Sequence, residues 1–124
     1  AISRVLLIED EKIIAHSIER TFAKKNHQVF VAVNAREARK ILKDEKIDLI
    51  LLDIILPDVD GFQLLDEFKK DDATKDIPVI IVSNLGQKEE IEKGKERGAV
   101  DYIIKSNTIP GEILKKVENI LKNR

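Results

Sequence analysis

The sequence has no cysteine, methionine or tryptophan, and only 3 prolines and 5 glycines interrupt its 124 residues. Without cysteine, a disulfide framework, a thiolate zinc site and thiol catalysis are all excluded. No apolar run approaches the roughly 20 residues that cross a bilayer, and no basic segment leads into an apolar one as in a secretion signal. We therefore expect a cytoplasmic protein that has no membrane partner.

An excess of charge of either sign is also lacking, because 22 basic residues stand against 23 acidic ones. No basic tract is present, so direct binding to a nucleic-acid backbone is not expected. The two histidines, His16 and His27, have no motif spacing between them, and we expect solvated side chains rather than ligands. With 43% apolar and 36% charged residues, the chain is expected to form one globular domain, 1–124.

Apolar runs alternate with amphipathic segments along the whole chain. Short runs of branched apolar residues predict buried strands, and apolar residues three or four positions apart predict helices. The strands are expected at 5–8, 29–32, 49–52, 78–82 and 100–104. The helices are expected at about 11–25, after an N-cap at Asn34, from Asp60, at 87–97 and at about 108–122. Repeated alternation of this kind predicts an α/β fold, with one parallel sheet between two layers of helices.

A carboxylate, Asp53, follows the apolar run at 49–52, and Pro57 and Gly61 end regular structure soon afterwards. In open α/β sheets, ligands bind outside the carboxyl ends of the strands. A carboxylate beside a buried strand is costly unless it is paired or used, so Asp53 is a candidate functional residue. The alternative interpretation is an ordinary turn residue at the end of a strand.

Polar residues follow the other strands at the same predicted edge: Glu9 and Asp10, then Ser83, then Lys105. Two carboxylates about 4 Å apart repel by about 4 kcal/mol at an effective dielectric near 20, and a divalent cation removes that penalty. An oxygen-only site beside a phosphate suits Mg²⁺. Lysine and serine suit phosphoryl oxygens, and aspartate forms aspartyl-phosphates. Each residue alone is more often a solvated or capping residue, so the inference depends on their joint placement.

Together these residues resemble the receiver domain of two-component response regulators, and the resemblance covers essentially the whole chain. Its carriers are Glu9-Asp10, Asp53 with the segment 54–57 and Asp60-Gly61, then Ser83, Gly98-Ala99, Tyr102 and Lys105. The resemblance implies a flavodoxin-like doubly wound (βα)5 three-layer sandwich with strand order 2-1-3-4-5.

The resemblance also implies a role for each site residue. Asp53 would accept a phosphoryl group from a sensor histidine kinase or phosphotransfer domain, and Ser83 and Lys105 would contact its oxygens. The implied Mg²⁺ ligands are Asp10, Asp53, the backbone carbonyl of Ile55 and, through water, Glu9. The chain would not be an ordinary enzyme, but a phosphoacceptor that catalyses its own phosphoryl transfer and dephosphorylation.

The expected switch involves Tyr102, which would change rotamer when Ser83 moves toward the phosphoryl group. The surface of the fourth helix, fifth strand and fifth helix would then change toward an output protein or domain, or toward a second copy in a phosphorylation-linked homodimer. The segment 87–97 has one clear apolar anchor, Ile91, and an interior glycine, Gly94, which costs about 1 kcal/mol relative to alanine. We expect this helix to be the least stable and to store the switch.

Two positions depart from the family pattern. Ser106 follows Lys105 where the family usually has proline after a cis peptide, so this loop is expected to be strained or rearranged. Ile55, two residues after Asp53, is bulky and apolar; with Leu85 it is expected to shield the phosphoryl group from water.

Three alternative functions fit the residues less well. A phosphatase of the haloacid dehalogenase type needs a second aspartate where Ile55 stands, and a nucleotide-binding module needs a glycine-rich loop where Glu9-Asp10-Glu11 stands. A degenerate receiver acting only as an interaction module normally lacks acidic or lysine positions that are all present here.

Overall fold

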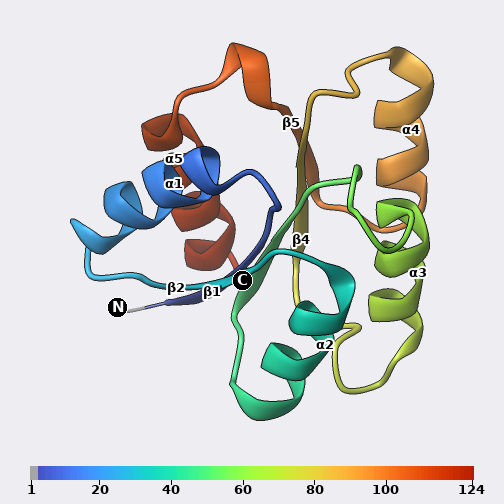
Figure 1. The fold of residues 1–124 in the computed structure, drawn as a ribbon, viewed down its shortest axis with the longest axis horizontal. Helices are drawn as coiled ribbons and strands as arrows, with labels where there is room; N and C mark the ends of the chain where they lie inside the picture. Colours follow the sequence, from blue (N-terminus) through green and yellow to red (C-terminus); the bar gives the residue numbers. More distant parts are fainter. Residues whose placement is uncertain (1–2) are drawn as a thin grey trace.

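The computed structural model describes residues 3–124 and has one parallel sheet with helices on both faces (Figure 1). The strand order is β2-β1-β3-β4-β5, which confirms the predicted topology. The strands are β1 (Arg4–Ile8), β2 (Gln28–Ala32), β3 (Leu49–Leu52), β4 (Val79–Ser83) and β5 (Asp101–Ile104). All four neighbouring pairs are parallel.

The helices form two layers, with α1 and α5 on one face of the sheet and α2, α3 and α4 on the other (Figure 1). Their bounds are α1 (Lys12–Ala23), α2 (Ala35–Asp44), α3 (Gly61–Lys70), α4 (Lys88–Glu96) and α5 (Pro110–Lys122), with a short 3₁₀ helix η1 (Lys105–Asn107) before α5. None of these helices is long and apolar enough to cross a bilayer.

Helix starts follow the expected capping chemistry in two cases. The side chain of Asn34 accepts a hydrogen bond from the Glu37 amide at 2.8 Å, and Asp60 accepts one from the Phe62 amide at 2.8 Å. The last helix begins at Pro110 rather than near residue 108, because proline is suited to the first helical position.

The central strand β3 is buried on both faces. Leu49 and Leu51 pack against the layer of α1 and α5, whereas Ile50 and Leu52 pack against the layer of α2, α3 and α4. Side chains alternate across a strand, so a fully apolar run supplies both cores at once.

The expectation of a solvated His27 is wrong, whereas His16 is exposed as expected. The His27 ring is buried, with Nδ1 2.6 Å from the Ser3 hydroxyl and Nε2 2.9 Å from a Glu118 carboxylate oxygen. The residue lies just before β2, where α5 covers it, and a buried ring of this kind needs such partners.

Candidate functional site

The carboxyl ends of β1, β3, β4 and β5 bring the predicted site residues to one edge of the sheet. Ile8 pairs with Leu52, so the residues that follow them, Glu9 and Asp53, are neighbours. The Asp53 amide donates to the Ile8 carbonyl at 3.1 Å, which continues this pairing one residue beyond β3. On the other side, Ser83 is the last residue of β4 and pairs with Ile104, which directly precedes Lys105.

Lys105 lies at the centre of this edge. Its Nζ atom is 2.6 Å from Asp53 Oδ2, 2.7 Å from Glu9 Oε1 and 3.1 Å from Glu11 Oε2. Burial alone would lower the pKa of Lys105, but the carboxylates of Asp53 and Glu9 outweigh it and raise the pKa above its ordinary value. The ammonium group is therefore charged at any physiological pH.

Glu11 is the member of this cluster that the sequence reasoning missed. Its signal was visible as the third acidic residue in the run Glu9-Asp10-Glu11, but only Glu9 and Asp10 were assigned to the site, and Glu11 counted only toward the repulsion of a pyrophosphate. The structure shows that its carboxylate turns back toward Lys105.

Glu9 is almost completely buried, with 1% of the residue exposed. Burial raises the pKa of Glu9 although the Lys105 ammonium opposes that shift. Its second oxygen accepts the backbone N–H of Glu11 at 3.0 Å. Both oxygens of this carboxylate are thus held in place.

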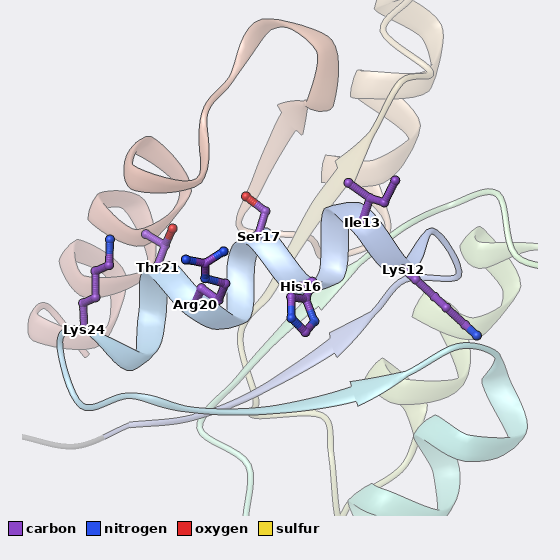
Figure 2. Close-up of a pocket in the computed structure, with 7 residues that line it drawn as sticks. All are labelled: Lys12, Ile13, His16, Ser17, Arg20, Thr21 and Lys24. Atoms are coloured by element: carbon purple, nitrogen blue, oxygen red, sulfur yellow. The ribbon is translucent and has the colours of Figure 1, made fainter.

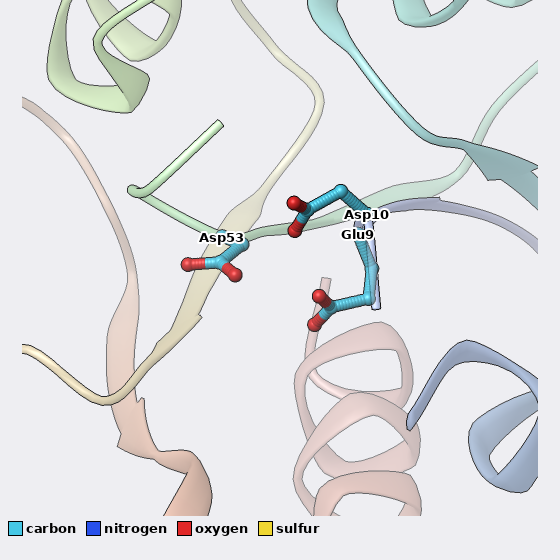
Figure 3. Close-up of side chains that lie close together, drawn as sticks. All are labelled: Glu9, Asp10 and Asp53. Carbon is cyan, nitrogen blue, oxygen red and sulfur yellow. The ribbon is translucent and has the colours of Figure 1, made fainter. Parts of the chain in front are cut away.

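Three carboxylates, those of Glu9, Asp10 and Asp53, each offer an oxygen within 4.8 Å of the others. Figure 3 shows the Asp10 and Glu9 side chains extending from the end of β1 into the space beside Asp53. An oxygen-only set of this kind fits Mg²⁺, and carboxylate crowding gives it a reason to bind a cation. The Ile55 amide donates to Asp53 Oδ1 at 3.1 Å, which orients the central carboxylate.

Ser83 and Tyr102 meet at the loop that follows β4. Ser83 is fully buried, and its hydroxyl accepts the Leu85 amide at 3.3 Å. The Tyr102 hydroxyl donates to the Leu85 carbonyl, and burial raises the pKa of this phenol. Tyr102 therefore already lies inward in this structure.

Gly94 explains how the tyrosine fits under α4. A Cβ atom at this position would lie 2.6 Å from Ile81 Cδ1 and 3.1 Å from Tyr102 Cδ2. The glycine lets α4 approach β4 and β5 closely, which is a packing role that its helix propensity alone does not reveal.

Comparison with known proteins decides the family. The sequence profile of the response regulator receiver domain matches residues 5–118, and these residues include every member of the cluster described above. The chain belongs to the response regulator receiver domain family.

Individual relatives agree with this assignment. Protein PilH of Pseudomonas aeruginosa is 35% identical over 103 residues, which is 83% of this chain and 85% of that protein. The phosphate regulon transcriptional regulatory protein PhoB of the same species is 33% identical over 118 residues, covering 95% of this chain but 51% of PhoB. The receiver domain thus spans about half the length of several curated relatives it matches.

Solved structures show the same fold. The CheY-like response regulator receiver domain protein from Methanospirillum hungatei JF-1 has a TM-score of 0.89 at 27% identity, covering 99% of this chain and 96% of that one. The receiver domain of the Francisella response regulator 1452 has a TM-score of 0.89 at 30% identity, covering 98% of each chain.

A groove of about 770 Å³ opens beside the site, between the loop after β3 and the start of α4. Ile55 and Leu85 both line it, and Ile55 is 57% exposed although it is large and apolar. Lys93 and Phe62 also line the groove, and the Lys93 ammonium lies 4.4 Å from the ring centroid of Phe62. The two residues predicted to shield the phosphoryl group therefore line the same groove at this edge.

The exposed face of α1 forms a second surface near the site. Figure 2 shows the side chains that line a shallow pocket there: Lys12, Ile13, His16, Ser17, Arg20, Thr21 and Lys24. Ile13 is 87% exposed, although apolar side chains of this size are usually buried. Its position off the buried stripe of Ile18 and Phe22 was the available signal, and the sequence reasoning did not use it.

The loop after Lys105 has no cis peptide bond, unlike the family pattern. The peptide bonds between the residues that the structure describes are all trans, including the one before Ser106. Residues 105–107 form η1, and the Ser106 amide donates to the Asn84 side chain at 3.0 Å. The loops after β4 and β5 are joined through this bond.

Proposed function

We propose that this receiver domain accepts a phosphoryl group on Asp53 in a Mg²⁺-dependent reaction, with a sensor histidine kinase or phosphotransfer domain as donor. The observation that carries the proposal is the 2.6 Å ion pair between Lys105 and Asp53 inside a cluster of carboxylates that suits a divalent cation. The degenerate alternative is disfavoured because the acidic residues and the lysine are all present and converge.

In the proposed reaction, an Asp53 carboxylate oxygen attacks the phosphorus atom of phosphohistidine. The new P–O bond forms as the P–N bond breaks, and the imidazole nitrogen leaves with the electron pair. The Lys105 ammonium exchanges its contact with Asp53 for a contact with a phosphoryl oxygen, because the negative charge is now on that group. The Ser83 hydroxyl donates a hydrogen bond to another phosphoryl oxygen. Asp10, Asp53, the Ile55 carbonyl and, through water, Glu9 would hold Mg²⁺, which would supply positive charge against the transferred group.

Ser83 would pass the conformational change from the site to the loop after β4. Its hydroxyl now accepts the Leu85 amide, so a move toward the phosphoryl group changes the loop whose carbonyl binds Tyr102. That loop leads directly into α4, and Tyr102 lies on β5. The surface of α4, β5 and α5 would then change toward an output protein or domain, or a second copy of the chain.

The surface of α1 is a suitable dock for the donor. Exposed Ile13 and the cations of Lys12 and Arg20 lie on the helix that begins two residues after Asp10. An apolar anchor flanked by positive charge suits an acidic, partly apolar helix. Because histidine kinases are phosphorylated by ATP inside the cell, we expect the receiver to act in the cytoplasm.

The experiment is intact mass measurement after incubation with Mg²⁺ and acetyl phosphate. One added phosphoryl group is expected, labile to mild base and hydroxylamine as an acyl phosphate is. It should be absent without Mg²⁺ and absent in Asp53→Asn. The matched control is Asp72→Asn, which removes a highly exposed carboxylate that is not part of the site. This variant should be labelled like wild type. Equal labelling of Asp53→Asn would refute the assignment.

A further inference from the structure

The Lys105 ammonium has one carboxylate partner more than the proposed reaction uses. Asp53 is the acceptor and Glu9 holds the metal through water, but Glu11 has neither role. An ammonium group has three N–H donors, and the three ion pairs of 2.6, 2.7 and 3.1 Å account for all of them. Lys105 therefore has to give up a partner before it can reach a phosphoryl oxygen.

The backbone of Glu11 is fixed at the start of α1. Its N–H donates to Glu9 Oε2 at 3.0 Å, and its carbonyl accepts the Ala15 amide at 3.0 Å. Glu11 is the N-cap residue of this helix, yet its side chain makes no capping hydrogen bond. Serine, threonine, aspartate or asparagine would cap better, so helix stability does not explain a glutamate here.

We propose that Glu11 is a positioning residue for Lys105, which acts by holding the ammonium beside Asp53 and Glu9. This inference rests on the proposed function. The Glu11 side chain is 57% exposed, whereas those of Asp53 and Glu9 are 6% and 1% exposed, so Glu11 is the outermost partner. The ion pair between Glu11 and Lys105 is also the longest of the three, and it is therefore the easiest to break.

This role predicts that loss of the Glu11 charge changes Mg²⁺ binding and the reaction with an anionic phosphodonor in opposite directions. Four carboxylates lie at this edge and three of them pair with the Lys105 ammonium, so the excess negative charge attracts a cation and repels an anionic phosphodonor. Neutralising Glu11 weakens the attraction and the repulsion together. It also leaves the third N–H of Lys105 with an uncharged and therefore weaker acceptor, which a phosphoryl oxygen displaces more easily. A residue that only stabilised the fold would not move the two properties in opposite directions.

The experiment compares wild type, Glu11→Gln and Glu11→Asp, with Glu112→Gln as a control that removes one exposed charge from α5. For Glu11→Gln we expect the Mg²⁺ dissociation constant from calorimetry to rise by about threefold to tenfold. At saturating Mg²⁺, its phosphorylation rate with acetyl phosphate should rise by about twofold to fivefold. Glu11→Asp should restore both values at least in part, and Glu112→Gln should match wild type.

A third measurement does not depend on the metal or on phosphoryl transfer. In the metal-free protein, NMR exchange of the Lys105 ammonium protons with water should be faster in Glu11→Gln than in wild type. Values for Glu11→Gln equal to wild type in all three measurements would overturn the inference and leave the proposed function standing. A wild-type protein that takes no phosphoryl group would overturn both, and a drop in both affinity and rate would assign Glu11 a structural role only.

Discussion

Four carboxylates crowd the carboxyl edge of the sheet and three of them pair with the single ammonium of Lys105, whereas at the amino edge Arg4 and Glu45 form a one-to-one pair. The Arg4 guanidinium also donates to the Lys46 carbonyl at 2.8 Å and lies 5.0 Å from the ring centroid of Phe30. The charges of Arg4 and Glu45 balance each other, and the contacts of Arg4 help to hold the fold together at the amino edge. The excess at the other edge works against the fold, so it requires a function to explain it.

Asp10→Asn gives the largest expected effect. Removing a proposed direct ligand should raise the Mg²⁺ dissociation constant at least tenfold. It should also move the urea midpoint of the metal-free protein upward, because one of several crowded charges is gone. Calorimetry and urea denaturation check the two parts. A lower midpoint without metal would show that the carboxyl edge is as balanced as the amino edge.

Arg4→Met tests the opposite edge. Loss of the Glu45 pair, the backbone bond and the contact with Phe30 should lower the free energy of unfolding by about 1–2 kcal/mol. Mg²⁺ affinity and the rate of phosphorylation should stay at wild-type values. A change in either would mean that the two edges are coupled.

Ile55→Asn tests whether an apolar side chain at the carboxyl edge protects the product. Hydrolysis needs a water in line with the phosphoryl group, and Ile55 and Leu85 line the groove beside it. We expect the phosphoryl group to be lost several-fold faster in the variant, about 1 kcal/mol in the barrier. Mass measurement after removal of the phosphodonor gives the decay rate. A slower decay in the variant would contradict shielding.

The helix α4 starts at the carboxyl edge, and the hydrogen exchange of its backbone amides should respond to a phosphoryl group bound there. Ile91 is only partly buried on α4, whereas α5 buries Ile113, Leu114 and Val117. We expect amides of α4 to exchange with solvent faster than those of α5. Their protection should also change when beryllofluoride is added with Mg²⁺. Equal protection and no response would remove α4 as the switch.

Asp58 gives the smallest effect and supplies an internal contrast. It lies in the loop after β3, but its carboxylate accepts the Ala35 and Arg36 amides at the start of α2. These backbone bonds lower the pKa of Asp58. Its stabilising contribution is therefore complete above the pKa of the unfolded chain, and is lost as the pH falls through the lower pKa of the folded protein. Urea midpoints of wild type and Asp58→Asn should differ at pH 7 and converge in acid.

The architecture and most of the site were accessible from the sequence because both depend on short patterns. Apolar runs such as 49–52 supply strands, parallel strands end at one edge, and polar residues after them must then meet there. That reasoning predicted the convergence of Asp53 and Lys105, and their 2.6 Å ion pair confirms it.

What could not be predicted depends on contacts between distant segments. The burial of His27 requires α5 to cover the turn before β2, and no local pattern carries that information. Gly94 was counted only as a weak point in a helix, whereas the structure shows that Tyr102 needs the space. The ion pair of Glu11 depends on how its side chain turns back from the N-terminus of α1.

The bond between Ser106 and Asn84 limits how this protein can be altered. The Ser106 amide is the donor, and proline has no backbone N–H. The substitution Ser106→Pro, which introduces the usual family residue, would therefore remove the hydrogen bond to the Asn84 oxygen. The loops after β4 and β5 would no longer be joined by it. Positions 84 and 106 have to be redesigned together, so swapping loops between this receiver and its relatives requires exchanging both.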